Sequence, residues 1–197
     1  MSRVIIVVHR GALRESIGCL LPLIVNTVTS SLLVSHGIRK DTTLHLFFNE
    51  DGIDLMFIGS QVRQLRPDEQ STKGILRKAK LKLERGIKGK FSKIHTGILM
   101  SRTTLSKLMS TSVKGHSSLL KLKNEFKRGL DIRLIDFDKY TSFIFIVPLM
   151  PLDEQLLKDV NGDILNIKLS RERLNAPQLI VLFHNEVDRH VFKQSRH

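Results

Sequence analysis

The stretch Val4-Ile5-Ile6-Val7-Val8-His9 decides the fold, because it is a short apolar run rich in β-branched residues. Such a run is typical of a strand that is buried on both faces of a sheet. The next long segment, 16–34, carries no charge but is interrupted by Pro22 and by several hydroxyl and amide residues. A transmembrane helix needs about 20 predominantly apolar residues, so we interpret this segment as a buried amphipathic helix that packs on the sheet.

Two further strands follow, and the residues between them specify a hairpin. Segments 43–48 and 53–59 have strand character and flank the turn Asn49-Glu50-Asp51-Gly52, whose composition is typical of a hairpin. Pro67-Asp68-Glu69 then places a proline and two acids in a first helical turn, which predicts a helix that ends at 86–89.

The rest of the chain continues the alternation of strands and helices. Thr103 and Thr104 can cap a short helix that reaches about residue 109, and 112–118 is typical of a polar loop. Further predicted elements are strands at 131–137, 143–147 and 164–169, and helices at 153–160 and 177–192. The alternation predicts one α/β domain over residues 1–197, with a mainly parallel sheet and helices on both faces.

Positive charge is concentrated in one part of the chain. The 197 residues contain 32 Lys and Arg against 19 Asp and Glu, and the segment 73–128 holds 16 of the basic residues with only two acids, Glu84 and Glu125. A concentrated basic segment favours a polyanionic partner such as RNA; a solvated helix face is the alternative. The candidate RNA-contacting residues are Arg77, Lys78, Lys80, Lys82 and Arg85.

The chain lacks the common signatures of catalysis and metal binding. It has no GxGxxG, no GxSxG and no HExxH, and its 8 histidines show no metal-ligand spacing. The single cysteine, Cys19, excludes a disulfide framework and is interpreted as a small apolar residue. Residue chemistry alone thus indicates a basic α/β protein that faces RNA and holds no metal.

Three clusters of residues carry a resemblance to a known family. They are Ser35-His36-Gly37-Ile38-Arg39-Lys40-Asp41, then Phe57-Ile58-Gly59-Ser60 with Arg66-Pro67-Asp68-Glu69, and finally His184-Asn185-Glu186-Val187-Asp188-Arg189. In this order and at these separations, and together with the step Thr96-Gly97-Ile98, they resemble the archaeal tRNA pseudouridine-54 N1-methyltransferases of the SPOUT superfamily. The resemblance extends from Val4 to Arg189 and covers most of the chain.

The resemblance implies a fold and a cofactor that the residue patterns do not. It implies a C-terminal trefoil knot, although chains in general do not knot, a homodimer, and S-adenosylmethionine (SAM) held by three loops of the knot. The first loop would follow a strand that ends at Leu134, the second would begin at Val147, and the third would span 169–174. The cofactor-binding residues implied in this way are Leu134, Val147, Leu169, Ser170, Arg171, Glu172, Arg173, Leu174 and Leu179.

The second loop departs from the family pattern. Family members usually have a Gly-Asp-His step and further glycines there, whereas this chain has Val147-Pro148-Leu149-Met150-Pro151. Since glycine permits close approach of the backbone to a ligand, we expect valine and proline to narrow or re-route this loop. Arg171 stands where the family typically has Pro, and Leu179 where it has Cys, while Ser170 and Leu174 match.

The implied chemistry is methyl transfer to N1 of pseudouridine, which requires positioning and a route for the N1 proton. Asp41 and Arg39 are the candidate catalytic residues: Asp41 as acid–base or orienting group, and Arg39, with Lys40, to hold a phosphate or a base carbonyl. The alternative is structural, with Asp41 capping the strand and Arg39 paired to it. Asn185 offers one donor and one acceptor to a uracil-like edge, or bonds the neighbouring backbone.

The function that follows is SAM-dependent methylation of tRNA by a cytoplasmic homodimer without a membrane segment. The closing helix carries apolar residues on more than one face, which predicts a dimer through this helix. These residues are Leu179, Ile180, Leu182, Phe183 and Val187. One alternative is a relative that binds RNA without methylating it. A ribosome-associated basic protein is less favoured, because the charge lies in one region rather than in terminal arms.

Overall fold

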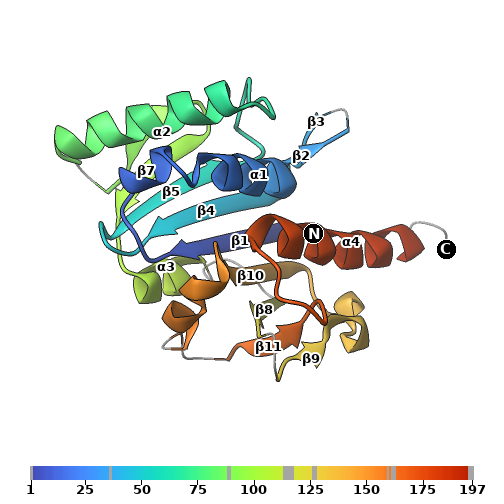
Figure 1. Cartoon of the computed structure of the whole chain (residues 1–197). Helices are drawn as coiled ribbons and strands as arrows, with labels where there is room; N and C mark the ends of the chain where they lie inside the picture. The colour runs from blue at the N-terminus through green and yellow to red at the C-terminus, as the bar shows by residue number, and fades with distance from the viewer. Residues whose placement is uncertain are drawn as a thin grey trace.

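The computed structural model describes residues 2–35, 37–87, 90–112, 118–125, 128–158, 160 and 163–194, with side chains as far as residue 190. Figure 1 shows a large twisted sheet with helices packed against it. Its strands are β1 (Ser2–His9), β2 (Leu33–Val34), β3 (Gly37–Ile38), β4 (Thr42–Phe48), β5 (Ile53–Ile58), β6 (Ser92–His95), β7 (Ile98–Arg102), β8 (Leu119–Asn124), β9 (Leu130–Asp131), β10 (Ser142–Pro148) and β11 (Leu165–Lys168). Its α-helices are α1 (Leu21–Leu32), α2 (Glu69–Glu84), α3 (Leu105–Ser112) and α4 (Ala176–Gln194).

The described strands form one sheet of nine, in the order β6-β7-β5-β4-β1-β10-β8-β11-β9, while β2 and β3 form a separate pair. Strand β1 lies between β4 and β10, and both pairings are parallel. Strands β8, β11 and β9 extend the parallel part, whereas β5, β7 and β6 add an antiparallel edge. The predicted α/β fold with a mainly parallel sheet is confirmed, and so is the hairpin between β4 and β5.

Alternating apolar residues of the central strands supply two cores, one on each face of the sheet. Ile5 and Val7 belong to the core formed with α1, α2 and α4, whereas Ile6 and Val8 pack with α3 and the 3₁₀ segment Pro151–Leu157. A strand in the middle of such a sheet has no face left for water. The predicted helices on both faces are therefore present (Figure 1). Within the described residues, no helix is long and apolar enough to cross a bilayer.

The strand predicted at 131–137 is wrong. Only its first residue belongs to a strand, β9, and the chain then makes two 3₁₀ turns, Ile132–Leu134 and Phe137–Lys139. The carboxylates of Asp131 and Asp136 cap these turns, each accepting from the backbone N–H two residues further on, at 3.0 and 3.3 Å. Local aspartate turns of this kind compete with strand pairing, even where apolar and polar residues alternate.

Other elements agree with the sequence patterns to different degrees. The helix predicted at 153–160 is instead the 3₁₀ segment Pro151–Leu157, and the patterns do not predict β6, β7 or β8. The loop predicted at 112–118 lies mostly outside the described residues. The predicted start of α2 is confirmed, because the Asp68 carboxylate accepts from the backbone N–H three residues on, at 2.6 Å. Thr104 likewise accepts from the first turn of α3.

Two glycines allow close backbone contacts next to the functional regions. A Cβ on Gly59 would lie 2.0 Å from the carbonyl oxygen of Arg39, so the end of β5 touches the loop before β4 directly. Gly97 has a φ of +73°, and a Cβ there would lie 2.3 Å from the backbone nitrogen of Val62. Only glycine fits either contact, which gives a physical role to two glycines of the resembling segments.

Candidate functional site

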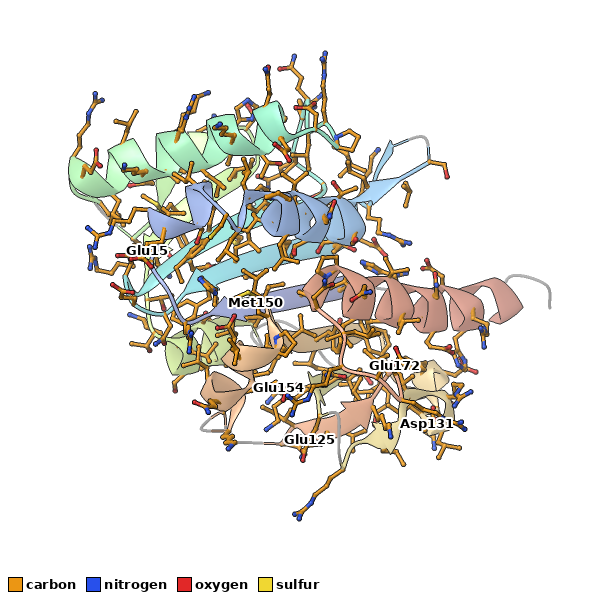
Figure 2. The ribbon with its side chains drawn as sticks, in the orientation of Figure 1. Glu15, Glu125, Asp131, Met150, Glu154 and Glu172 are labelled. Atoms are coloured by element: carbon orange, nitrogen blue, oxygen red, sulfur yellow. The ribbon has the colours of Figure 1, made fainter. Side chains whose placement is uncertain are left out.

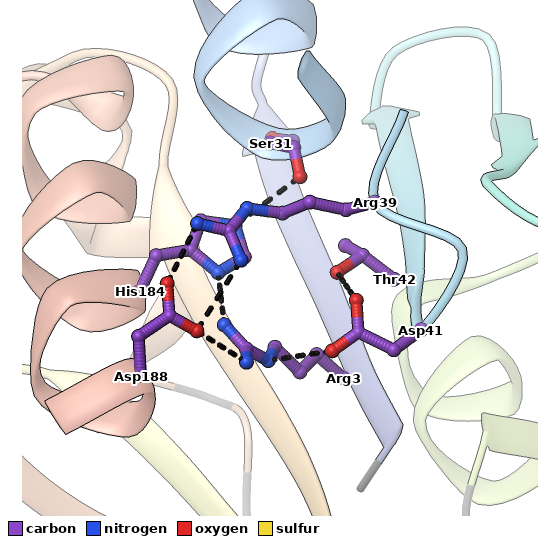
Figure 3. Close-up of polar contacts among 7 residues, drawn as sticks. All are labelled: Arg3, Ser31, Arg39, Asp41, Thr42, His184 and Asp188. Carbon is purple, nitrogen blue, oxygen red and sulfur yellow. Dashed lines mark hydrogen bonds and ion pairs between the residues drawn. The ribbon is translucent and has the colours of Figure 1, made fainter. Parts of the chain in front are cut away.

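A polar cluster forms where the start of β1, the segment before β4 and helix α4 meet, at the amino ends of the central strands (Figure 3). This arginine cluster consists of Arg3, Arg39, Asp41, Thr42, His184 and Asp188. His184 and Asp188 lie four residues apart on α4. Residues at this spacing share one helix face, so both can reach the first residues of β1.

Arg3 is the centre of the arginine cluster and is only 3% exposed. Its guanidinium donates to Nδ1 of His184 at 2.9 Å and to Oδ1 of Asp188 at 2.5 Å. Its Nε lies 3.1 Å from Oδ2 of Asp41. A buried guanidinium is costly unless its charge and its N–H groups are met by partners. Asp188 and Asp41 meet the charge, and His184 and Asp188 accept hydrogen bonds. Nε lies within ion-pair distance of Asp41 but makes no hydrogen bond among the described residues.

Arg39 and Asp188 form a two-pronged ion pair. Nη2 of Arg39 donates to Oδ2 of Asp188 at 2.7 Å, and Nη1 donates to Oδ1 at 3.3 Å. Burial acts to raise the pKa of Asp188, but the hydrogen bonds and charges of Arg39 and Arg3 outweigh it and lower that pKa below its ordinary value. Asp188 is therefore a carboxylate at neutral pH and holds the two guanidinium groups together.

His184 is held as a neutral ring with one defined tautomer. Its Nδ1 faces Arg3, which can only donate, so Nδ1 accepts and the ring proton lies on Nε2. That Nε2–H donates to the carbonyl oxygen of Ser31 at 3.2 Å. Burial, together with the charges of Arg39 and Arg3, lowers the pKa of His184 to about 3. The ring thus joins α4 to both β1 and α1 without carrying charge.

The candidate catalytic residues Arg39 and Asp41 both lie in the arginine cluster, but they do not pair with each other. Arg39 pairs with Asp188, whereas Asp41 pairs with Arg3 and accepts a hydrogen bond from Thr42 Oγ1 at 3.1 Å. The alternative in which Arg39 pairs with Asp41 is therefore wrong, because the two residues have different partners. The Asp41 side chain is 36% exposed, which leaves part of its carboxylate open to a substrate.

The candidate RNA-contacting residues lie at the surface. Lys40 and Asn185 are exposed, on the loop before β4 and on α4. Helix α2 buries one face against the core, because its apolar residues recur at helical spacing. Its basic residues lie outside this face: Arg77, Lys78 and Arg85 are exposed, and Lys80 and Lys82 are partly exposed.

A cavity of about 560 Å³ opens at the other end of the sheet, beyond the carboxyl ends of β8 and β10. It is lined by residues 123–125, by the 3₁₀ segment and the residue after it, 151–158, and by Arg173. Glu125 and Glu154 come from two different walls of this region (Figure 2). Open α/β sheets bind ligands outside the carboxyl ends of their strands, in pockets of about 300–1,000 Å³.

Of the cofactor-binding residues implied by the resemblance, all of which the structure describes, only Arg173 lines this cavity. Val147 and Leu179 are 0% and 2% exposed and belong to the core on the α4 side. Leu169 and Leu174 are partly buried and pack against the same core. The cavity therefore borders the third implied loop without including most of its residues.

The remaining implied residues lie at the surface or in a turn. Leu134 is 72% exposed and lies on a 3₁₀ turn, not at the end of a strand, because the chain leaves β9 three residues earlier. Arg171 and Glu172 are exposed. The hydroxyl of Ser170 accepts from the backbone N–H of Glu172 at 3.0 Å, so Ser170 caps the turn of the third loop.

The second loop is buried and held by backbone hydrogen bonds at its start. Strand β10 continues to Pro148, and Leu149 is 2% exposed. The N–H of Leu149 donates to the carbonyl of Val8 at 2.8 Å, and its own carbonyl accepts from Ala176 N at 3.3 Å. A buried leucine side chain therefore lies in the loop where the family pattern has glycines.

The arginine cluster and the cavity lie at opposite ends of the parallel strands. Arg3 pairs in register with Phe143 near the start of β10, while the cavity begins beyond its last residue, Pro148. At a rise of about 3.3 Å per strand residue, the two regions are separated by roughly 15–20 Å. One protomer does not bring Asp41 and the cavity together.

Sequence reasoning missed Arg3, the most connected residue of the arginine cluster. The available signal is an arginine at the start of a strand whose next five residues are all apolar or β-branched. His184 and Asp188 belong to the third resembling cluster, but no local pattern indicates their role, because their partner on β1 is 181 and 185 residues away in the sequence.

The sheet is mainly parallel, has a ligand-sized cavity at its carboxyl edge and carries a basic helix on its surface. These features are typical of an α/β protein that binds a small molecule and a polyanion. A family model described as "Putative SAM-dependent RNA methyltransferase" matches residues 8–192. The chain belongs to this family of SAM-dependent RNA methyltransferases, and the family inferred from the sequence clusters is confirmed.

Relatives match over most of their length. A protein of Methanococcus maripaludis strain C5 is 27% identical over 183 residues, covering 86% of this chain and 85% of the relative. One of Methanococcoides burtonii is 28% identical over 177 residues, covering 86% and 83%. Both are named tRNA (pseudouridine(54)-N(1))-methyltransferase. The structure of Archaeoglobus fulgidus Nep1 bound to S-adenosylhomocysteine superposes with a TM-score of 0.62 at 13% identity, covering 96% of this chain and 98% of Nep1, which shows a shared fold.

Proposed function

We propose that this protein transfers the methyl group of SAM to N1 of pseudouridine 54 in the T-arm of tRNA, the reaction named for its relatives. The observation that carries the proposal is the cavity of about 560 Å³ at the carboxyl ends of β8 and β10, in a chain of this family. Its size suits a nucleoside cofactor. SAM, when bound, supplies a methyl group on a positively charged sulfur.

The polar residues that line the cavity fit the groups that SAM carries. SAM has a ribose diol, an ammonium group, a sulfonium and a carboxylate. Glu125 and Glu154 can accept hydrogen bonds from the hydroxyl groups or the ammonium group, and Arg173 can bind the carboxylate. Lys123 also lines the cavity, but its Nζ donates to the carbonyl of Leu157 at 3.1 Å, so we assign it to the wall rather than to the ligand.

The arginine cluster supplies the groups that act on the RNA base. Pseudouridine is joined to ribose through carbon, so its N1 carries a hydrogen that must leave on methylation. Asp41 keeps lone pairs free beside its contacts with Arg3 and Thr42 and can accept this proton, directly or through water. The Nε–H of Arg39, which its pair with Asp188 leaves unused, can bind a base carbonyl or a phosphate.

The separation of the two regions in one protomer favours a homodimer in which the arginine cluster of one copy faces the cavity of the other. Leu179, Ile180, Phe183 and Val187 are buried within the protomer, so these residues of α4 are not available for the predicted dimer interface. Val181 is 43% exposed on α4 and remains available for an interface. The proposed trefoil knot would involve the second and third loops, whose backbones meet at the Leu149–Ala176 hydrogen bond.

A relative that binds RNA without methylating it is a second candidate, favoured by one specific observation. Leu149 is buried in the second loop, where the family pattern has glycines and a ligand would need room. The basic surface of α2 does not depend on this loop, so RNA binding can persist without cofactor binding.

Calorimetric titration with SAM and a methyl-transfer assay separate the two candidates. The RNA substrate is a tRNA T-arm with pseudouridine at position 54, and its matched control carries uridine there, whose N1 is bonded to ribose and cannot be methylated. We expect SAM binding, and methyl transfer to the first RNA alone. Absence of both at millimolar SAM, with RNA binding retained, would overturn the methyltransferase proposal in favour of the RNA-binding relative.

A further inference from the structure

The antiparallel edge of the sheet carries a groove that the proposed methyl transfer does not use. The loop between β5 and α2, the first turns of α2 and the turn between β6 and β7 enclose three adjoining cavities of about 810, 550 and 120 Å³. Gln64 lines all three, so we call them together the Gln64 groove. It lies at the far side of the sheet from β8, β11 and the cavity there.

The walls of the Gln64 groove are held by backbone contacts. The turn at Gly97 lies against the backbone of residues 61–62, and its carbonyl accepts from Ile58 N at 2.8 Å. Gln64 itself has a φ of +59°, a conformation that a residue with a side chain rarely adopts. A loop held in such a conformation keeps its shape only where its surroundings determine it.

The groove is basic. Arg63, Arg66 and Lys78 line it, and all three are exposed. None has an ion-pair partner among the described residues. Asp68 is the one acid in the lining, and its carboxylate caps α2 through Ser71 N. The uncompensated charge is therefore positive and suits phosphate groups.

One buried polar atom in the groove wall has no partner. His95 lines two of the cavities, and its Nδ1 is buried without a hydrogen bond among the described residues. Buried polar atoms are nearly always satisfied. A turn of the ring toward the groove would let a bound hydroxyl or phosphate oxygen satisfy this nitrogen. The groove floor is apolar, formed by Val62, Leu65 and Ile98 among others, as in a pocket that excludes water from such a contact.

The basic residues of α2 fall into two rows, and only one continues the groove. Lys78 lines the groove, and Lys82 and Arg85 follow it at spacings of four and three residues, on the same side of the helix. Arg77 and Lys80 lie on the other row, where Lys80 Nζ is 3.9 Å from a carboxylate oxygen of Glu84. The positive surface thus runs from the Gln64 groove along one side of α2.

We propose that the Gln64 groove binds the sugar–phosphate backbone of RNA, as a site separate from that of methyl transfer. Arg63, Arg66 and Lys78 contact phosphates, and His95 Nδ1 contacts a ribose hydroxyl or a phosphate oxygen. Five strand spacings separate β7 from β8, which at about 4.8 Å each is roughly 24 Å, so one folded RNA can reach both regions. The inference rests on the proposed function only in naming tRNA as the RNA.

The test compares two variants that each remove two positive charges. Arg63→Gln/Arg66→Gln alters the groove, and Arg10→Gln/Arg14→Gln, at two exposed arginines outside the groove and outside the basic segment 73–128, is the matched control. Affinity for an unmodified tRNA is measured without SAM over a range of salt. The groove variant should bind roughly tenfold more weakly at low salt, and the slope of log K against log[salt] should fall in magnitude by about 1.4–1.8, or 0.7–0.9 for each lost phosphate contact.

The control variant should keep the wild-type slope, and both variants should keep wild-type SAM affinity and thermal stability. A third variant, His95→Phe, should weaken tRNA binding, because it removes the proposed contact of the ring nitrogen. Equal losses of tRNA affinity in the two charge variants would overturn the proposal that the groove binds RNA. A wild-type protein that binds no tRNA would overturn it as well. Because the readout needs no methyl transfer, a wild-type protein that binds tRNA through the groove but transfers no methyl overturns the proposed function alone.

Discussion

The neutral state of His184 makes a specific contribution to the pH dependence of stability. In the folded protein its pKa is lowered from 6.5 to about 3, because the ring is buried and the charges of Arg39 and Arg3 oppose a second ring proton. Between these two values the unfolded chain binds one more proton than the folded protein. Stability therefore rises with pH across this window and is lost as the pH falls from 6.5 toward 3.

The magnitude follows from the shift. One proton taken up only by the unfolded state costs about 1.4 kcal/mol for each pH unit, so His184 alone should lower the free energy of unfolding by about 2 kcal/mol between pH 7 and pH 5. The variant His184→Gln keeps one donor and one acceptor but cannot titrate. It should be less stable than the wild type at pH 7, and the difference between the two proteins should shrink by about 2 kcal/mol at pH 5.

Urea denaturation at pH 7, 6 and 5, followed by circular dichroism, measures this double difference. The control variant His190→Gln retains His184. Its free energy of unfolding should therefore still fall by the amount that His184 causes between pH 7 and pH 5. If wild type and His184→Gln lose the same free energy between pH 7 and pH 5, the ring takes up its proton in the folded state. The reasoning from burial and from the Arg3 contact would then be refuted.

Three further predictions concern single side chains. Asp188→Asn should lower the free energy of unfolding by about 2–3 kcal/mol at pH 7, measured in urea, because buried Arg3 loses a charged partner. Since the pKa of Asp188 is lowered, its contribution to stability is present above the ordinary value of 3.8 and fades below it. Equal stability of variant and wild type at pH 7 would contradict this prediction. Gly97→Ala should lower the free energy of unfolding by at least about 2 kcal/mol, because the alanine would have a φ of +73° and its Cβ would clash with the backbone. The measurement is the Tm, and an unchanged Tm argues against the clash. Asp41→Asn should leave SAM binding intact in calorimetry and slow methyl transfer about 100-fold, whereas a wild-type rate removes Asp41 from the proton route.

The parts of the fold with strong local signals could be predicted. The run at β1, the turn Asn49–Gly52 and the Pro67-Asp68-Glu69 start of α2 each combine composition and position in a way that has one common structural outcome. Strand β8 also has a signal, since leucine and lysine alternate from Leu120 to Lys123. Its lysines also belong to the basic segment 73–128, so the period of two is easily masked by the charge pattern.

Segment 131–137 shows why alternation alone is insufficient. The pattern of this segment suits a strand, yet the side chains of Asp131 and Asp136 bond to nearby backbone N–H groups and bend the chain into 3₁₀ turns. In the site, Arg39 and Asp41 could be found through the resemblance, but their partners could not. Asp188 and Arg3 are joined to them by tertiary contacts that no local pattern records.

The arginine cluster joins Arg3, at the start of β1, to α4, the last of the described helices. This long separation in sequence sets the order in which the partners are synthesised. Arg3 emerges from the ribosome 185 residues before Asp188, which at about 5–20 residues per second is a delay of roughly 10–40 seconds. Throughout that interval the strand can exist, but its arginine has neither His184 nor Asp188. The arginine cluster is therefore completed only when α4 has been made, so a nascent chain that lacks α4 holds Arg3 without two of its partners.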